Sequence, residues 1–230
     1  MKTVYALNEI NGVVITIDVQ HQSMKNYVYV ILNPQDKQAI VIDPAWEIDK
    51  IEAALNGFTL THILLTHSHI DHTHLVIPLV EKHRCSVWMS KAEIESSGYQ
   101  CPQLNAINTE APLRCGTFLV QPFFTPGHTP GSVCFGIGEA LFTGDTLFSE
   151  GCGACFGDEG NPRDLYASLR YLKQEIPEST RIFPGHSFGI PPGQTLKQIM
   201  GYNIYLSFTK ESAFVAFRMR KGQAGFFDFK

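Results

Sequence analysis

The chain has 230 residues and a formal net charge of −4 at neutral pH, and its lysines and arginines are scattered rather than gathered into a stripe. This length suffices for one domain with a full core, and the charge gives no indication of nucleic-acid binding. No apolar stretch approaches the roughly 18 residues of a membrane helix, and the start of the chain lacks the apolar run of a signal peptide. We therefore expect a cytoplasmic protein with one domain over residues 1–230 and no membrane partner.

The first part of the chain predicts three strands, a helix and a further strand. The three strands, rich in Val, Ile and Tyr, are expected at Gly12–Val19, Tyr27–Leu32 and Gln38–Ile42. Apolar residues at helical spacing predict a helix over Glu47–Asn56, which stops at Gly57. A strand over His62–Thr66 and a helix that ends near His83 follow.

The rest of the chain continues with strands and then changes to helices. Strands are expected at Cys85–Met89, Phe118–Phe124, Ser132–Ile137, Ala140–Thr143 and Arg181–Phe183, and helices at Asp164–Ile176, Gln194–Tyr202 and Lys210–Lys221. Strands dominate each half and helices follow them. This order favours an α/β (α+β) fold in which two sheets pack face to face with helices outside.

One short loop after the strand His62–Thr66 concentrates side chains that bind metals. Its candidate ligands are His67, His69, Asp71 and His72. Three imidazoles and a carboxylate crowded at the end of a buried strand are hard to explain structurally, whereas a divalent cation resolves the conflict. The His-x-His pair points two imidazoles the same way from an extended segment, and the Asp-His pair aims at a neighbouring point. The loop therefore predicts two adjacent metal positions.

Three downstream residues extend this set. His128, Asp145 and His186 each follow a short apolar run and sit beside a glycine, as expected for a ligand presented on a tight turn. Zinc accepts imidazole nitrogen and carboxylate oxygen, and seven ligands are too many for one tetrahedral ion. We expect two zinc ions per chain, with iron or a mixed iron–zinc pair as the alternative. His74 is expected to line the mouth of the site or to cap a helix turn.

The cysteines do not predict a second metal site. The six thiols are expected to be reduced, because the chain is large and shows no small disulfide framework. Cys152 and Cys155 form a C-x-x-C motif, but no second cysteine pair completes a structural zinc site. The glycines around the motif mark a loop close to the metal-binding turns.

These seven positions, in this order, resemble the metallo-β-lactamase superfamily, and within it the glyoxalase II type of thioester hydrolase, from about Asn26 to His186. The resemblance implies an αββα four-layer sandwich, with residues 190–230 as a short C-terminal extension. It implies a first metal held by His67, His69 and His128, a second held by Asp71, His72 and His186, and Asp145 bridging both. It also implies hydrolysis by a hydroxide that the metals share, with Asp71 and Asp145 as the catalytic residues that orient it.

Departures from the glyoxalase II pattern affect the expected substrate. Glutathione-dependent members resemble one another in placing a Lys and then a Tyr where this chain has Ala154 and Phe156, and the loop also carries the acidic Asp158 and Glu159. The tail after His186 is similar to that of the zinc hydrolases encoded with bacterial modular polyketide synthases. This resemblance implies a thioesterase for polyketide-related acyl groups on an acyl carrier protein or a pantetheine arm.

Other functions remain open at this stage. A glyoxalase II would hydrolyse S-lactoylglutathione, and a mono-iron sulfur dioxygenase would use His67, His128 and Asp145 on one iron. A non-catalytic metal-binding protein is the alternative from a different class. A class B β-lactamase is disfavoured, because such enzymes place no bridging aspartate where Asp145 lies.

Overall fold

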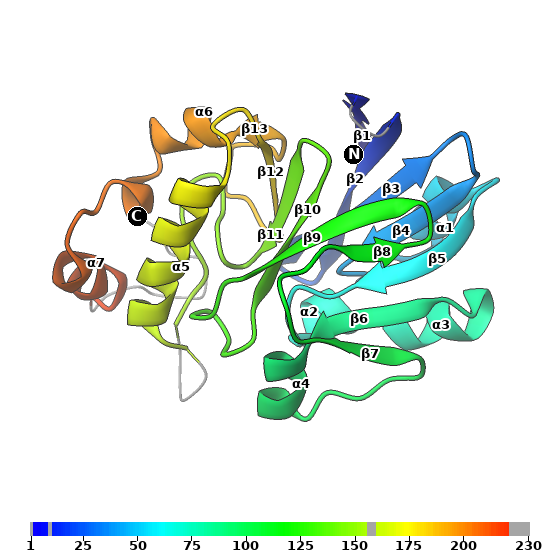
Figure 1. The fold of residues 1–230 in the computed structure, drawn as a ribbon, viewed down its shortest axis with the longest axis horizontal. Coiled ribbons are helices and arrows are strands. Elements are labelled where there is room, and N and C mark those ends of the chain that lie inside the picture. The colour runs from blue at the N-terminus through cyan, green and yellow to red at the C-terminus, as the bar shows by residue number, and fades with distance from the viewer. Residues whose placement is uncertain (1, 9–10, 156–159, 221–230) are drawn as a thin grey trace.

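The computed structural model describes residues 2–8, 11–155 and 160–220, and it contains two β-sheets packed face to face (Figure 1). The strands are β1 (Lys2–Leu7), β2 (Gly12–His21), β3 (Met24–Asn33), β4 (Gln38–Ile42), β5 (Thr59–Leu64), β6 (Ser86–Ser90), β7 (Leu104–Ile107), β8 (Leu113–Cys115), β9 (Phe118–Phe124), β10 (Val133–Ile137), β11 (Ala140–Gly144), β12 (Arg181–Pro184) and β13 (Gln194–Thr195). The first sheet has the order β1-β2-β3-β4-β5-β6-β7 and the second the order β13-β12-β11-β10-β9-β8. Both are mixed, because β4 to β7 and the pair β11–β12 run parallel.

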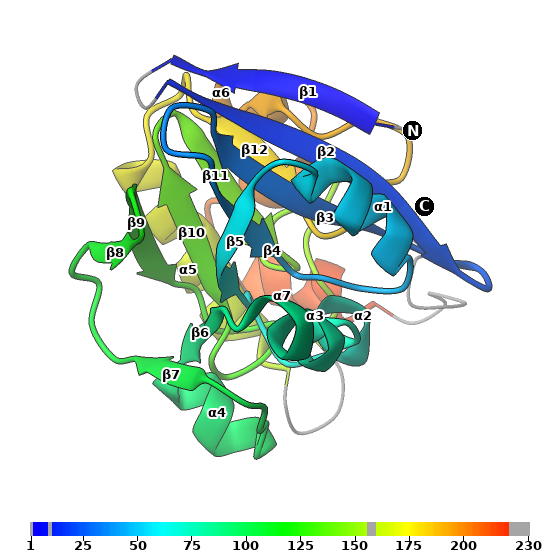
Figure 2. The same ribbon diagram turned by 90° about the vertical axis from the view of Figure 1, so that its right-hand side faces the viewer.

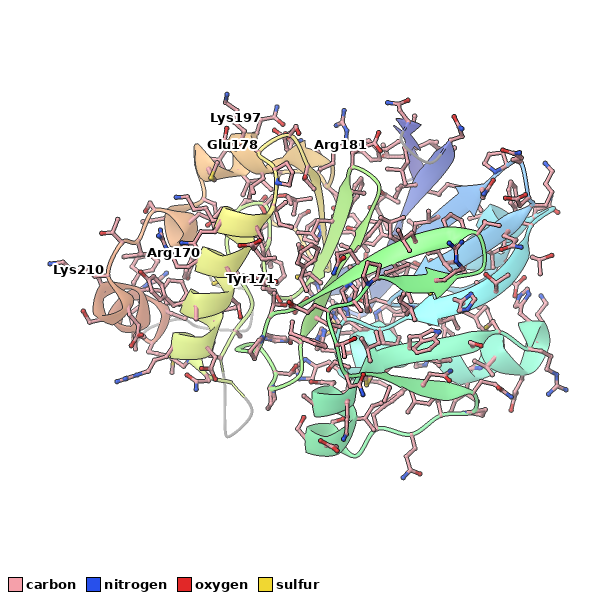
Figure 3. All side chains as sticks on the ribbon, viewed as in Figure 1. Arg170, Tyr171, Glu178, Arg181, Lys197 and Lys210 are labelled. Atoms are coloured by element: carbon pink, nitrogen blue, oxygen red, sulfur yellow. The ribbon has the colours of Figure 1, made fainter. Side chains whose placement is uncertain are left out.

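Helices cover the outer face of each sheet. They are α1 (Ile48–Leu55), α2 (Ile70–Thr73), α3 (Val76–His83), α4 (Lys91–Ser97), α5 (Pro162–Glu175), α6 (Leu196–Met200) and α7 (Glu211–Arg218), with a 3-10 helix η2 (Ile204–Leu206). Figure 2 shows α1 and α3 on the side of the first sheet, and Figure 1 shows α5, α6 and α7 beyond the second. The exposed side chains of Lys197 and Lys210 point outward there (Figure 3). The αββα arrangement predicted from the sequence is confirmed.

The alternation of side chains along the strands builds the apolar layers. In β3, Val28 and Val30 face the helices of the first sheet, whereas Tyr29 and Ile31 point between the two sheets. A third layer joins α5, through residues such as Leu165, to the outer face of the second sheet. Each fully buried aliphatic side chain of this kind stabilises the fold by roughly 1.5–3 kcal/mol. The two sheets therefore share one apolar interface, and their strand ends are held in fixed relation.

Several element boundaries differ from the predictions for local reasons. The helix expected to end near His83 is two helices, α2 and α3, with a break at Leu75. The strand expected at His62–Thr66 ends at Leu64, because the backbone N–H of Thr66 donates to a side chain rather than to a strand. Thr195 is the N-cap of α6, so the predicted helix Gln194–Tyr202 begins later and is also shorter.

The chain beyond α6 packs against the second sheet. The helix predicted at Lys210–Lys221 ends at Arg218, and Lys221 lies outside the described residues. Phe208 contacts both Phe214 and Phe217, and these aromatic side chains pack into the apolar layer between α5 and the second sheet. Strands β1, β7, β8 and β13 and helix α4 were not predicted. All six cysteines are unpaired. Within the described residues, no helix has both the length and the apolar character needed to span a membrane.

Candidate metal centre

The seven predicted residues converge where strands of both sheets end. His67, His69, Asp71 and His72 follow β5, His128 lies in the turn between β9 and β10, Asp145 follows β11, and His186 follows β12. They form groups whose nitrogen or oxygen atoms lie within 4.8 Å of one another. We call His67, His69 and His128 the three-histidine set, and Asp71, His72 and His186 the mixed set. The structure thus brings together the seven residues that the sequence analysis named as candidate ligands, whereas their roles as metal ligands stay predictions.

Hydrogen bonds from Nδ1 fix the orientation of the His128 and His186 rings, so that Nε2 faces the centre of the site. Nδ1 of His128 donates to the carbonyl of Ala154 at 2.7 Å, and Nδ1 of His186 donates to the carbonyl of Lys25 at 2.6 Å. A carbonyl oxygen only accepts, so each of these nitrogens carries the proton. When these rings are neutral, their Nε2 atoms therefore present lone pairs to the centre of the site, and this is the form that binds a metal.

The three-histidine set brings nitrogens closer than mutual hydrogen bonding explains. Nε2 of His67 and Nε2 of His128 lie 3.0 and 3.1 Å from Nδ1 of His69. Nδ1 of His69 has at most one proton, so it can donate to only one of these neighbours. Burial, reinforced by the surrounding imidazoles, lowers the pKa of His67 well below its ordinary value, and burial lowers the pKa of His128. Neutral imidazoles pointing at one position suit a cation there.

The mixed set carries a strong negative potential. Nε2 of His186 lies 3.3 Å from Oδ2 of Asp71, and Nε2 of His72 lies 3.5 Å from the same oxygen. Burial disfavours a charged imidazolium, but the carboxylates of Asp71, Asp145 and Asp43 raise the pKa of His72 to about 10. Burial likewise opposes the charged form of His186, whose pKa is nevertheless raised by Asp145 and Asp71. A divalent cation would replace that positive charge.

Asp145 lies between the two sets. Its Oδ1 is 3.4 Å from Nε2 of His72, and its Oδ2 is 3.6 Å from Nε2 of His128 and 3.5 Å from Nε2 of His186. Both Oδ1 of Asp145 and Nε2 of His72 are buried without a hydrogen-bond partner. Buried polar atoms without partners are costly in a folded protein. The residues present therefore fit metal ions, and the position of Asp145 suits a bridging ligand.

Two residues that the sequence analysis missed support the mixed set. Asp43, after β4, accepts from the backbone N–H and the hydroxyl of Thr66, and its Oδ2 lies 3.0 Å from Nδ1 of His72. Asn26 donates to Oδ2 of Asp71 at 2.9 Å and accepts from Trp46. Asp43 stands directly after the predicted strand Gln38–Ile42, where a carboxylate could have been considered as part of the site. Asn26 gave no sequence signal.

The remaining histidines lie outside the cluster. His74 is exposed and packs against the ring of Trp46, 4.8 Å between centroids, at the C-terminal end of α2. This agrees with the capping alternative and not with a position at the mouth of the site. His21 is an exposed residue at the end of β2, and His83 lies at the end of α3 with an ion pair to Glu52.

A cavity of about 260 Å³ opens onto the cluster. Besides site residues, it is lined by the apolar side chains Met24, Ile70, Phe148 and Ala154. Among the described lining residues there is no lysine or arginine. Phe156, Asp158 and Glu159, which the sequence analysis also placed near the site, lie outside the described residues. The described wall suits an apolar group rather than an anion.

The C-terminal tail contacts the loop that carries Ala154. Arg218 is buried, and its Nε donates to the carbonyl of Gly153 at 2.9 Å. The backbone N–H of Gly153 donates in turn to the carbonyl of Asp145 at 2.8 Å. Gly153 has no room for a side chain, because a Cβ there would lie 2.0 Å from that carbonyl oxygen. The tail therefore supports the backbone of a candidate ligand and presents no guanidinium at this point to the cavity.

Comparison with known proteins agrees with this geometry. The sequence profile described as the metallo-beta-lactamase superfamily matches residues 24–186, more than half of the chain, so the chain belongs to that superfamily. It is 43% identical over 217 residues to the probable polyketide biosynthesis zinc-dependent hydrolase BaeB of Bacillus velezensis, covering 93% of this chain and 96% of the relative. A hydroxyacylglutathione hydrolase of Alkalilimnicola ehrlichii is 36% identical over 165 residues, covering 71% of this chain but 62% of that protein. The crystal structure of ETHE1 from Myxococcus xanthus superposes with a TM-score of 0.78 at 27% identity, covering 88% of this chain and 89% of that one.

Proposed function

We propose that this member of the metallo-beta-lactamase superfamily is a hydrolase of acyl thioesters, and that it holds two zinc ions between the three-histidine and mixed sets. When bound, such ions lower the pKa of a water molecule that they share and polarise the carbonyl group that it attacks. In the proposed reaction the water oxygen bonds to the carbonyl carbon and the carbon–sulfur bond breaks, which yields a carboxylic acid and a free thiol. The similarity to a zinc-dependent hydrolase over 93% of the chain supports this class of reaction.

The side chains of the protein would orient the reacting water. Oδ2 of Asp71 and Oδ2 of Asp145 both lie within 3.5 Å of Nε2 of His186, so the two carboxylates face the same small space. A carboxylate is a hydrogen-bond acceptor, so each can accept from a water molecule held there and fix its direction of attack. We assign Asp71 and Asp145 this catalytic role.

The apolar wall of the cavity is the observation that favours an acyl thioester on pantetheine over glutathione. Glutathione carries two carboxylates, which call for cationic partners, and the described lining offers Met24, Ile70 and Phe148 instead. Ala154 stands at the position where, by the resemblance described in the sequence analysis, glutathione-dependent members have a lysine. We therefore propose a polyketide-related acyl group carried on an acyl carrier protein or on its pantetheine arm.

A competition between two thiol carriers of the same acyl group tests this substrate. We expect kcat/KM for the acyl-pantetheine or the acyl carrier protein to exceed that for the acyl-glutathione by at least about tenfold, which corresponds to roughly 1.4 kcal/mol of differential transition-state binding. Equal or reversed preference would favour a hydroxyacylglutathione hydrolase, the second candidate, which the 36% identity over 71% of the chain supports.

Metal analysis distinguishes the remaining alternatives. Protein purified without chelator is expected to contain close to two equivalents of zinc. One equivalent of iron together with oxygen uptake would indicate the sulfur dioxygenase. Full metal content without turnover of any thioester would indicate a non-catalytic metal-binding protein.

A further inference from the structure

A carboxylate outside the cluster joins the two loops that carry the three-histidine set. Glu93, in the first turn of α4, is 1% exposed. Its Oε1 accepts from the backbone nitrogen and the hydroxyl of Ser68 at 2.8 and 2.7 Å. Its Oε2 accepts from the hydroxyl of Thr129 at 2.7 Å and from the backbone nitrogen of Gly131 at 3.1 Å. One side chain therefore ties the loop after β5 to the turn between β9 and β10.

These contacts fall next to each of the three histidines. Ser68 lies between His67 and His69, and Thr129 follows His128. Figure 1 shows α4 at the bottom of the molecule, beside β6 and β7. The nitrogens of the three-histidine set converge only if the two loops stay at a fixed separation, and Glu93 bridges that separation with hydrogen bonds to both loops.

Helix capping does not account for the orientation of Glu93. Ser90 is the N-cap of α4 and accepts from the backbone nitrogen of Glu93 at 3.1 Å. In a Ser-x-x-Glu capping box the glutamate returns to the backbone N–H of the cap residue. Gln198 does so in α6, where Thr195 donates to its Oε1 at 2.8 Å. The carboxylate of Glu93 is turned to the two loops instead.

Close packing and hydrogen-bond direction both restrict the position of the Glu93 side chain. A Cβ on Gly131 would lie 2.0 Å from the backbone nitrogen of Glu93, so only glycine lets the turn approach α4 this closely. The hydroxyl of Thr129 has one proton, which goes to Glu93 because a carboxylate accepts only. Ser132, at 2.6 Å, must then donate to Thr129. All four groups that face the carboxylate are donors.

We propose that Glu93 is a positioning residue that holds the two loops in register and thereby sets the metal affinity of the three-histidine set. Its four hydrogen bonds go to Ser68, Thr129 and Gly131, which are neighbours of the three-histidine set in the chain, so we expect its effect to fall mainly on that metal position. The inference rests on metal binding, which is part of the proposed function, and it is independent of the thioester substrate.

The variant Glu93→Gln tests this role. A carboxamide keeps the shape, but its NH₂ group must face the backbone N–H of either Ser68 or Gly131, so the hydrogen bond from that backbone N–H is lost and the connection to one loop is weakened. The matched control is Glu95→Gln on the same helix, where the side chain is exposed and pairs with Lys91. Zinc affinity is measured by competition with a chromophoric chelator. Anomalous scattering from crystals grown at limiting zinc assigns the occupancy of each position.

We expect zinc affinity at the three-histidine set to fall about 10–100-fold in Glu93→Gln, while affinity at the mixed set and both affinities in Glu95→Gln stay within about threefold of the parent. Equal losses at both positions, or none, would overturn the proposal. If Glu93→Gln does not fold, Thr129→Val removes a single donor, and the same selective loss in smaller size is expected. A parent protein that binds no zinc would refute the proposed metal centre itself, which separates the two failures.

Discussion

Nδ1 of His72 lies 3.0 Å from Oδ2 of Asp43, and both side chains are buried. The contact fixes the imidazole through its outer nitrogen and leaves Nε2 directed at Asp71 and Asp145. Asp43 comes from the end of β4, in the first sheet, and is itself bound by Thr66. The orientation of one candidate ligand therefore depends on a residue 29 positions away in the chain.

We predict that Asp43→Asn lowers zinc affinity by about 10–100-fold, the usual cost of losing a hydrogen-bond partner of a ligating histidine. The two bonds from Thr66 go to different oxygens of Asp43, so an asparagine that keeps the bond from the backbone N–H at Oδ1 turns its NH₂ group toward the Thr66 hydroxyl and His72, where an acceptor is needed. Asp49→Asn, at an exposed position of α1, is the control. Chelator competition measures both variants. An unchanged affinity in Asp43→Asn would show that His72 is oriented by other contacts.

Asp145→Ala is expected to remove essentially all hydrolytic activity and to weaken zinc binding at both positions while the fold survives. The reason is that its two oxygens face His72 on one side and His128 and His186 on the other. His74→Ala, at the exposed ring that packs against Trp46, should change metal content far less. Metal content and circular dichroism of both variants provide the test. Loss of metal in His74→Ala as complete as in His72→Ala would contradict the ligand assignment in this loop.

The sequence predicted the seven clustered residues because their chemistry is visible without the fold. Four of them stand within six positions, and the others sit beside glycines at strand ends, as His186 does. Strand bounds were predicted correctly where a run of apolar residues is long enough to be recognised, as in Gln38–Ile42 and Phe118–Phe124, whose bounds match β4 and β9. Short strands such as β8 carry too few residues for a period to be recognised.

The supporting residues could not be predicted, because their roles arise only when distant segments meet. Asn26 reaches Asp71 across 45 positions, and Glu93 reaches Thr129 across 36. The pattern Ser90-x-x-Glu93 could have indicated the start of α4. That pattern predicts that the carboxylate of Glu93 accepts from the backbone N–H of Ser90, whereas in the structure it accepts from Ser68 and Thr129. Local sequence therefore identifies the candidate ligands, whereas their orientation is a property of the tertiary structure.

The apolar wall of the cavity should control the preference for acyl chains. Ile70 lines the cavity although it is 63% exposed, so its substitution should leave stability nearly unchanged. We predict that Ile70→Asn lowers kcat/KM for a long acyl-pantetheine by about tenfold, or roughly 1.4 kcal/mol, and leaves acetyl-pantetheine within about twofold. Ile77→Asn, at a 46% exposed position that does not line the described cavity, is the matched control. Equal losses for the two acyl groups would mean that Ile70 does not contact the chain.

His62 should make the metal-free protein less stable in acid. It lies in β5, its Nδ1 is buried without a hydrogen-bond partner, and burial lowers the pKa of its imidazole. The unfolded chain, with an ordinary histidine pKa of about 6.5, therefore takes up a proton at a pH where the folded protein does not. Stability is present in full above the unfolded pKa and is lost as the pH falls from there toward the folded pKa.

We predict that His62→Phe, which cannot bind this proton, gains stability relative to the parent as the pH is lowered from 8 to 5. The free energy of unfolding of both metal-free proteins, measured by urea denaturation across this range, gives the difference between them. All other histidines are common to the two proteins, so the pH dependence of that difference isolates His62. A difference that stays constant across the range, or that shrinks in acid, would show that the folded protein binds the proton on His62 as readily as the unfolded chain does.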